Sequence, residues 1–210
     1  MSDFNAAEQP QDQPKPEGQD ASAPHSQQFS HNPVAARVPE RLARGAHATG
    51  CLVLDGPTEF VIDFMQGLTR PFQVVSRVVV HPQVMKQITA ALQDNLGKYA
   101  STFGMPPAPP PAPPNQKRPT IQEIYENFKV PEESLSGSYA NSVMIGHTQS
   151  EFYLDFITGF YPTAAVSTRV FLSASQVPRV VDTLNAAITQ HNKRSQGGPP
   201  PQQPPAPAGE

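Results

Sequence analysis

Several residue types are scarce in this chain of 210 residues, and each scarcity narrows the classes of protein to which it can belong. Tryptophan is absent, 37% of the residues are hydrophobic and 16% are charged. This hydrophobic content is too low for one core that spans the whole chain, and it leaves roughly 120 residues of foldable sequence between disordered segments. No apolar run approaches the roughly 20 residues of a membrane-spanning helix, so we expect no membrane insertion.

No charge of one sign dominates. With 18 acidic and 15 basic residues the net charge is −3, and a protein that binds a phosphate backbone usually shows a basic patch. Nucleic acid is therefore not the expected partner. The single cysteine, Cys51, excludes an intramolecular disulfide, and its apolar neighbours predict a buried, unreactive side chain. The N-terminal sequence lacks the basic and apolar regions of a secretory signal, which predicts a cytoplasmic protein.

Motifs of common catalytic chemistry are also missing from the sequence. It contains no glycine-rich phosphate loop and no Gly-x-Ser-x-Gly nucleophile turn. The histidines have neither metal-ligand spacing nor a neighbouring cysteine pair; they are His25, His31, His47, His81, His147 and His191. We predict no metal, no cofactor and no catalytic residue.

Proline, by contrast, is abundant. Of the 26 prolines, 19 lie before residue 45, between residues 106 and 114, or after residue 198. This composition predicts a disordered N-terminal arm (1–44), a stiff polyproline linker (104–118) and a disordered tail (196–210). Whether these segments are recognised by an aromatic groove or only extend and solubilise the chain stays open.

Between these segments the chain repeats itself. A shift of 92 residues aligns 45–103 with 137–195 without a gap, and TEFVIDFMQG then falls on SEFYLDFITG. Eleven of the 59 aligned positions are identical, namely Gly45, Ala48, Glu59, Phe60, Asp63, Phe64, Gly67, Val74, Arg77, Val78 and Leu92, each with its partner 92 residues later. We infer an internal duplication.

Each copy shows the same succession of patterns. Residues 46–54 and 138–147 predict a first strand, and alternating apolar residues predict two more strands in each copy, followed by a helix with apolar residues at i, i+4 spacing. The repeats 45–103 and 137–195 are thus predicted as β-β-β-α units. One such unit is marginal alone, so we expect an α+β fold in which the two repeats pack as a pseudo-two-fold pair.

The second repeat has a Tyr-Ala-Asn start, a Glu-Phe-x-Leu-Asp-Phe strand and a Thr-Arg-Val strand. The residues concerned are Tyr139, Ala140, Asn141, Glu151, Phe152, Leu154, Asp155, Phe156, Pro162, Arg169 and Val170. With these motifs the repeat resembles the bacterial and archaeal domain of unknown function 3467. The first repeat keeps most of these residues but begins with His47-Ala48-Thr49. The resemblance implies a fold and kinship, and it implies no activity.

Charged residues recur at the same places in both repeats: Glu59, Asp63 and Arg77, then Glu151, Asp155 and Arg169. Residues four apart in a strand lie about 13 Å from each other, whereas the carboxylates of glycosidases lie roughly 5–9.5 Å apart. We therefore predict structural ion pairs on the outer face of the sheet, worth up to about 1 kcal/mol. Contact of this charged face with a partner or with the other repeat stays open.

Residues 119–136 are predicted as a short amphipathic helix and a connector. Thr120 and Glu123 form a capping-box pattern, and the apolar residues on one helix face are Ile121, Ile124, Tyr125 and Phe128. So short a helix does not hold alone in water. It must dock either on a sheet of its own chain or in the groove of a partner.

These patterns favour a non-enzymatic module, adaptor-like or chaperone-like, that interacts with another protein. The alternative is a small-ligand binder or enzyme with a cleft between the two repeats, lined by Asp155, Arg169 and Tyr139. The sequence leaves the oligomeric state and the partner open.

Overall fold

The first half of the molecule forms four strands and one long helix. The structure is a computed structural model and describes residues 36–107, 120–160 and 162–195. The elements of the first half are β1 (Ala46–Ala48), β2 (Gly50–Asp55), β3 (Phe60–Gln66), β4 (Phe72–Val80) and α1 (Pro82–Phe103). The helix begins at Pro82, because proline suits the first helical position and His81 Nδ1 accepts a hydrogen bond from the backbone of Gln83.

The second half repeats this order after an additional short helix. Its elements are α2 (Ile121–Asn127), β5 (Phe128–Lys129), β6 (Ser138–Ala140), β7 (Ser142–His147), β8 (Glu151–Thr158), β9 (Ala165–Ser173) and α3 (Val177–Ser195). The fold is therefore of mixed α and β content, as the sequence predicts. None of the helices in the described part of the chain has the length and apolarity to span a membrane.

The two halves exchange strands. β2, β3 and β4 form one antiparallel ladder, and β7, β8 and β9 form another. β1 pairs in parallel with β9 of the second half, and β6 pairs in parallel with β4 of the first half. Each half therefore completes the sheet of the other.

The first strand predicted in each copy is in fact two strands, and this prediction is corrected. The chain turns at Thr49 and at Asn141, which separate β1 from β2 and β6 from β7. Thr49 Oγ1 accepts a hydrogen bond from the backbone of Gly67 at 3.0 Å, and Asn141 Oδ1 accepts one from Gly159 at 2.8 Å. Such side-chain bonds compete with the strand ladder, and the residues before them join the opposite sheet.

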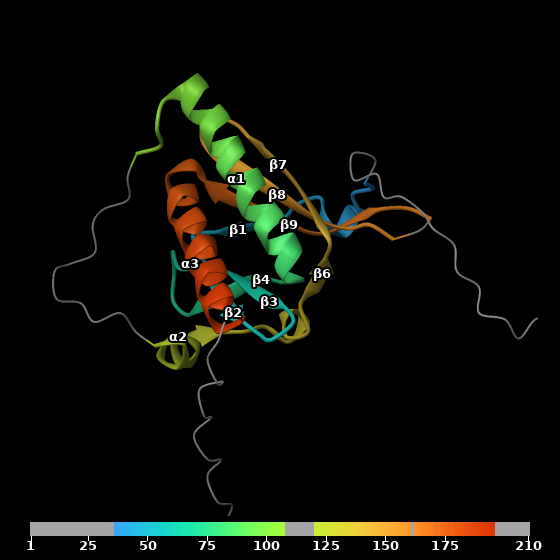
Figure 1. Ribbon diagram of the computed structural model, residues 1–210, viewed down its shortest axis with the longest axis vertical. Coiled ribbons are helices and arrows are strands. Elements are labelled where there is room, and N and C mark those ends of the chain that lie inside the picture. Colours follow the sequence, from blue (N-terminus) through green and yellow to red (C-terminus); the bar gives the residue numbers. More distant parts are fainter. Residues whose placement is uncertain (1–35, 108–119, 161, 196–210) are drawn as a thin grey trace, which may run out of the picture. The chain divides into compact units, whose positions relative to one another are not determined.

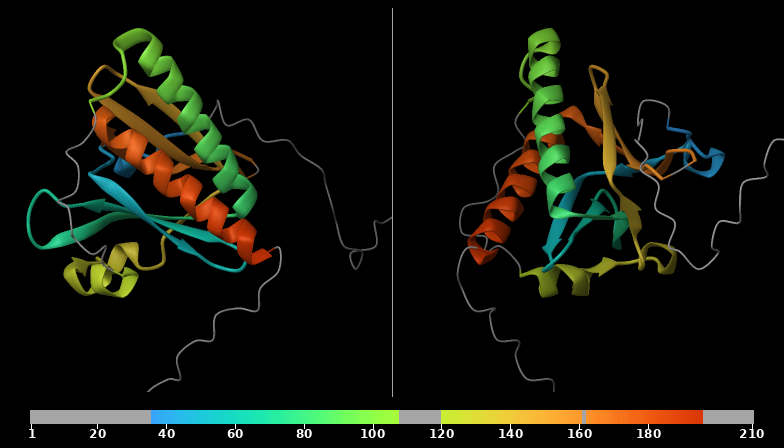
Figure 2. Two further views of the ribbon diagram at one scale, coloured as in Figure 1. Left: turned by 60° about the vertical axis from the view of Figure 1, so that its left-hand side comes forward. Right: turned by 45° about the vertical axis from the view of Figure 1, so that its right-hand side comes forward.

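The long helices also cross to the other half. α1 packs against β7 and α3 packs against β2, and the two helices lie side by side over the sheets (Figures 1 and 2). The core between helices and sheets draws on both halves. Its largest buried side chains include Phe60, Phe64, Met85, Leu92, Phe152, Phe156, Leu172 and Leu184.

The predicted N-terminal arm, 1–44, extends too far, because residues 36–44 belong to the fold. The backbone of Arg37 pairs in parallel with Ala165 at one end of β9, and its N–H donates to the carbonyl of Ala164 at 2.9 Å. A short 3₁₀ turn, η2 (Glu40–Leu42), follows.

The second half has the same arrangement 92 residues later. Lys129 of β5 pairs in parallel with Gln73 of β4, and the 3₁₀ turn η3 (Glu132–Ser134) follows. The segments that precede the predicted repeats are thus also duplicated. The disorder predicted for residues 1–35, for the linker from residue 108 and for the tail from residue 196 lies outside the described residues.

Candidate functional site: two faces with a paired aspartate and arginine

An aspartate and an arginine pair across adjacent strands on the face of each sheet that points away from the long helices. In the first half, Asp63 of β3 lies opposite Arg77 of β4. Arg77 donates from Nε to Asp63 Oδ1 and from Nη2 to Oδ2, both at 2.7 Å. Two parallel bonds of this kind are the strongest arrangement of these groups. The bonds to Asp63 raise the pKa of Arg77.

α2 covers this first face. The hydroxyl of Tyr125 donates to Asp63 Oδ2, and Arg77 Nη1 donates to the carbonyl of Leu135, beyond η3, at 3.0 Å. The ring of Phe128 lies 5.3 Å from that of Phe72. Burial, together with the bond to Asp63, raises the pKa of Tyr125, so the phenol stays a donor at neutral pH.

The sequence signals for α2 correspond to its local structure. Thr120 Oγ1 accepts a hydrogen bond from the backbone of Glu123, and the carboxylate of Glu123 accepts one from the backbone of Thr120. These bonds hold the pKa of Glu123 below its ordinary value. Ile124 is half-buried, whereas Ile121 is 48% exposed and takes little part in docking.

The same pair stands on the second face. Arg169 of β9 donates from Nε and Nη2 to the two carboxylate oxygens of Asp155 on β8, both at 2.6 Å. The bonds to Asp155 raise the pKa of Arg169. Its guanidinium lies 6.0 Å from the ring centroid of Tyr153.

Over this second pair the surface is open in the described part of the molecule. A cavity of about 280 Å³ lies there, and its lining residues are Ala36, Val38, Met144, Tyr153, Asp155, Val166, Arg169 and Phe171. We call it the Asp155 pocket. The two faces thus share a buried ion pair and differ in what lies on it.

The difference follows from the residues that precede each copy. At the 92-residue spacing, Ala36 stands where the second half has Phe128, and Pro33 stands where it has Tyr125. Pro33 lies outside the described residues, but its side chain has no hydroxyl to donate. The segment that precedes the first copy therefore has no counterpart of the Tyr125 hydroxyl that caps Asp63.

The predicted ion pairs are corrected in two respects. Asp63 and Asp155 lie on the outer faces of the sheets, but they are buried there, at 0% and 4% exposure. Glu59 and Glu151 form no ion pair with any described residue. The Glu59 carboxylate accepts from the hydroxyl of Thr58, and the backbone of Glu151 bonds to the Thr148 hydroxyl. Only the aspartates are matched with arginines.

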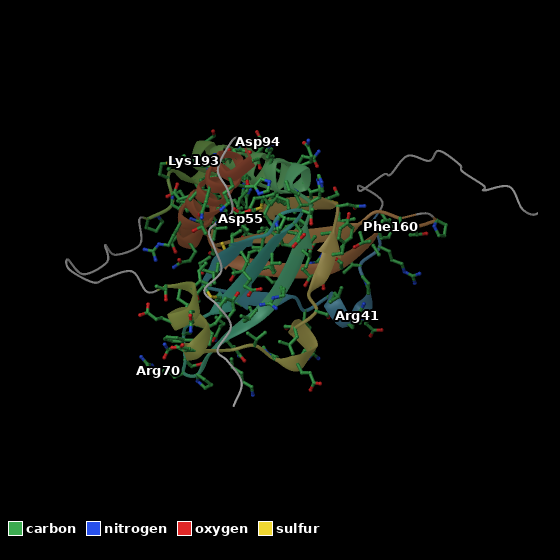
Figure 3. The ribbon with its side chains drawn as sticks, turned by 60° about the horizontal axis from the view of Figure 1, so that its bottom comes forward. Arg41, Asp55, Arg70, Asp94, Phe160 and Lys193 are labelled. Atoms are coloured by element: carbon green, nitrogen blue, oxygen red, sulfur yellow. The ribbon has the colours of Figure 1, made fainter. Side chains whose placement is uncertain are left out.

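Tyr139 does not line the Asp155 pocket. It is 45% exposed and stacks on Phe160 at 5.9 Å with nearly parallel rings. Phe160 lies near the tip of the hairpin between β8 and β9 (Figure 3). The cleft predicted between the repeats is therefore not where Asp155 and Arg169 lie, since their pocket sits on the outer face of one sheet.

Sequence reasoning missed a second polar cluster, in which α3 is fixed to β2. His191 Nδ1 lies 2.7 Å from Asp55 Oδ1, and Arg194 Nη1 lies 3.0 Å from Asp55 Oδ2. Figure 3 shows Asp55 near the C-terminal end of α3, where Lys193 is labelled. At the equivalent positions of the other half, Tyr99 packs on His147 at 5.6 Å.

A wider hollow of about 790 Å³ lies beside α2. It is formed by the loop before β4 and by one side of the helix. The residues that line it are Arg70, Pro71, Phe72, Glu123, Ile124, Glu126, Asn127 and Phe128.

The single cysteine, Cys51, lies in β2, where burial raises the pKa of its thiol to about 12. Among the described residues, no group of three His, Cys, Asp or Glu side chains is placed to hold a metal ion.

Fold and site together define a duplicated α+β protein whose halves exchange strands and helices and each present a buried aspartate–arginine pair. A family described as "Protein of unknown function (DUF3467)" matches residues 5–105 and again residues 110–196. The chain belongs to this family and carries two tandem copies of its domain, which confirms the resemblance noted in the sequence. No curated protein and no solved structure matches the chain.

Proposed function

We propose that the protein is a non-enzymatic protein-interaction module, of the adaptor or chaperone-like kind, whose outer sheet faces bind short helices of other proteins. The observation that carries this proposal is the docking of α2 on the first face. α2 has seven residues, far fewer than the roughly 12–15 that an isolated helix needs in water. Its contacts with the sheet must therefore supply most of its stability.

The contacts of α2 are of the kind that a helix-binding groove uses. A hydrogen bond runs from Tyr125 to the buried Asp63, and Phe128, which directly follows the helix, makes an aromatic contact with Phe72. Anchors of this type, at positions on one helix face, are how grooves recognise amphipathic helices. The sheet face thus contains within one chain a working example of the proposed interaction.

The two aspartates are held by their arginines as oriented hydrogen-bond acceptors. Both oxygens of Asp63 accept from Arg77, and both oxygens of Asp155 accept from Arg169. Each carboxylate oxygen has two acceptor positions, so the arginine fixes the orientation of the carboxylate and leaves it able to accept from a further donor. A face of this kind is suited to orienting a donor.

We further infer that the two copies are arranged as a pseudo-two-fold pair. In such an arrangement, residues at equivalent positions meet each other on the axis. Phe64 and Phe156, which are 92 residues apart, have ring centroids 5.6 Å apart. The hydroxyls of Ser76 and Thr168, at the same spacing, lie 3.1 Å apart. The reciprocal pairing of β1 with β9 and of β6 with β4 supports the same inference.

A small-ligand binder is the second candidate, and the Asp155 pocket is the observation that favours it. A pocket of about 280 Å³ lies just below the range of roughly 300–1,000 Å³ typical of ligand sites. It offers a guanidinium, a carboxylate and an aromatic ring. A partner protein and a small ligand therefore compete as occupants, and they can be separated by experiment.

The proposal is tested by placing a photoreactive amino acid at Met144, on the rim of the Asp155 pocket, in the full chain expressed in its own host. Met144 is 36% exposed, so the substitution leaves the core intact. Illumination is expected to yield one discrete cross-linked protein. The same photoreactive residue at Met105, which is 72% exposed and does not line that pocket, is the matched control.

Equal, diffuse cross-linking from both positions, or no cross-link from Met144, contradicts an interaction module. Retention of a small molecule by the purified protein, together with an absence of cross-links, favours the second candidate.

A further inference from the structure

We propose that the Asp155 pocket binds a tyrosine side chain presented by an amphipathic helix of a partner protein. This inference rests on the proposed function and names the chemistry of the partner. It starts from a comparison within the molecule, because the equivalent pair on the first face is capped by a helix that presents Tyr125.

The hydrogen-bonding groups of the pocket match those that Tyr125 and its connector satisfy on the first face. There, Asp63 Oδ2 accepts from both Arg77 and the tyrosine hydroxyl, and Arg77 Nη1 donates to the carbonyl of Leu135. In the pocket, Asp155 Oδ2 accepts from Arg169 alone among the described residues, and Arg169 Nη1 has no acceptor among them. Asp155 Oδ2 can thus accept one further hydrogen bond, and Arg169 Nη1 can donate one, to a group bound in the pocket.

The size and walls of the pocket suit an aromatic side chain. Its volume of about 280 Å³ can hold one large side chain and is small for a cofactor. Met144, Val166 and Phe171 line it with apolar surface, and methionine adapts its shape to irregular partners. A phenol places its ring against these walls and its hydroxyl toward Asp155, since tyrosine combines an apolar body with a polar tip.

The chain itself does not offer this group from its N-terminal side. Residues 1–35, which precede the first lining residue of the pocket, contain no tyrosine. Tyr125 is held by Asp63 on the other face. We expect the occupant from another protein, and a helix is the form in which this molecule already presents the group.

The probe for the test is a synthetic peptide of residues 119–135, acetylated and amidated, with a fluorophore at its N-terminus. It is titrated into the full chain up to about 1 mM, the range of a weak interaction, and binding is followed by fluorescence anisotropy. The peptide is expected to bind one site per chain. The Tyr125→Phe peptide is expected to bind at least tenfold more weakly, because it lacks the hydroxyl that would donate to the acceptor site of the pocket, Asp155 Oδ2.

Two variants of the full chain locate the site. Met144→Asp adds a charge to the rim of the pocket next to Asp155 and is expected to weaken binding at least tenfold. Met105→Asp makes the same change away from the pocket and is expected to leave binding unchanged. Circular dichroism and the unfolding midpoint of both variants show whether either change disturbs the fold.

The inference is overturned if the wild-type peptide does not bind at about 1 mM, or if neither Tyr125→Phe nor Met144→Asp weakens its binding. N-acetyl-tyrosinamide that binds as tightly as the peptide also overturns it, since the site is then one for a small phenol. A third outcome separates the two proposals. If a partner is cross-linked from Met144 in cells but the peptide does not bind, the protein is still an interaction module, and the proposal that the pocket binds a tyrosine on a helix is wrong.

Discussion

The carboxylate of Asp63 receives hydrogen bonds from two nitrogens of Arg77 and from the hydroxyl of Tyr125, and none of it is exposed. The carboxylate of Asp155 receives the two bonds from Arg169 alone among the described residues, and the Arg169 side chain is 21% exposed against 15% for Arg77. Removal of one partner of a buried pair leaves the other charge poorly solvated. Loss of the aspartate should therefore destabilise the protein more in the Asp63–Arg77 pair than in the Asp155–Arg169 pair.

We expect Asp63→Asn to lower the free energy of unfolding by about 3–5 kcal/mol. Asp155→Asn should lower it by roughly 1–3 kcal/mol, because water can reach the Arg169 guanidinium through the pocket. Urea unfolding at neutral pH measures both values. Equal losses would show that α2 contributes nothing to the burial of the first pair.

Residue patterns predicted the pairing of these groups but not their surroundings. The alternation in β3 and β4 puts Asp63 and Arg77 on the same face, and the antiparallel register makes them neighbours. Their surroundings include α2, which packs on that face from more than 40 residues further along the chain. The apolar pattern of a short helix predicts which of its faces is buried, but it does not predict which sheet that face packs on.

At the scale of elements, the predicted strands and helices are largely present, whereas the exchange between the halves is not visible in the pattern. The alternation of residues continues through Thr49 and Asn141, so it gives no sign that the chain leaves one sheet for the other. One signal was available: the 92-residue spacing continues upstream, where RVPE at 37–40 matches KVPE at 129–132. This match indicates that the two repeats begin upstream of residues 45 and 137.

A glycine precedes each exchanged strand and lets the backbone pass closely over the arginine below it. Gly137 has φ +70°, and a Cβ there would lie 2.9 Å from Arg77 Cγ and 3.1 Å from Val79 Cγ2. Gly45 has the same role before β1, with φ +62° and Arg169 Cγ at 2.9 Å. Only glycine combines this conformation with this closeness.

We expect Gly137→Ala to destabilise the protein by more than about 1 kcal/mol, because a methyl group there meets both strain and Arg77. Gly97→Ala is the matched control. Gly97 lies exposed in α1 with no atom within 4 Å of the added Cβ, so this change should stabilise the helix by about 1 kcal/mol. Thermal unfolding followed by circular dichroism compares the two. A neutral Gly137→Ala would show that β6 can approach β4 along another path.

At the scale of the whole molecule, neither half contains all the contacts that it needs. Each sheet takes an edge strand from the other half, and α1 and α3 each cover a strand of the other half. Units that share their core in this way should open together. Local unfolding of one half alone would expose the apolar faces of both.

We therefore expect Leu184→Ala, in α3, to speed hydrogen exchange equally in β3 and β8. Leu184 is 1% exposed in the shared core, and its truncation should cost about 2–5 kcal/mol. Exchange measured by mass spectrometry on peptides from both strands provides the comparison. Leu135→Ala, at a residue 55% exposed, should change exchange little. Faster exchange confined to β8 would mean that the halves unfold independently.

The reciprocal exchange of β1 and β6 has a consequence for how the fold responds to dilution. A chain with one copy could complete its sheet only by meeting a second molecule. Its stability would then decrease as the protein is diluted. With both copies on one chain, the meeting is intramolecular and proceeds at a fixed effective concentration. The fused pair can stay folded at any abundance, and its two outer faces are free to diverge because they no longer have to be copies of one surface.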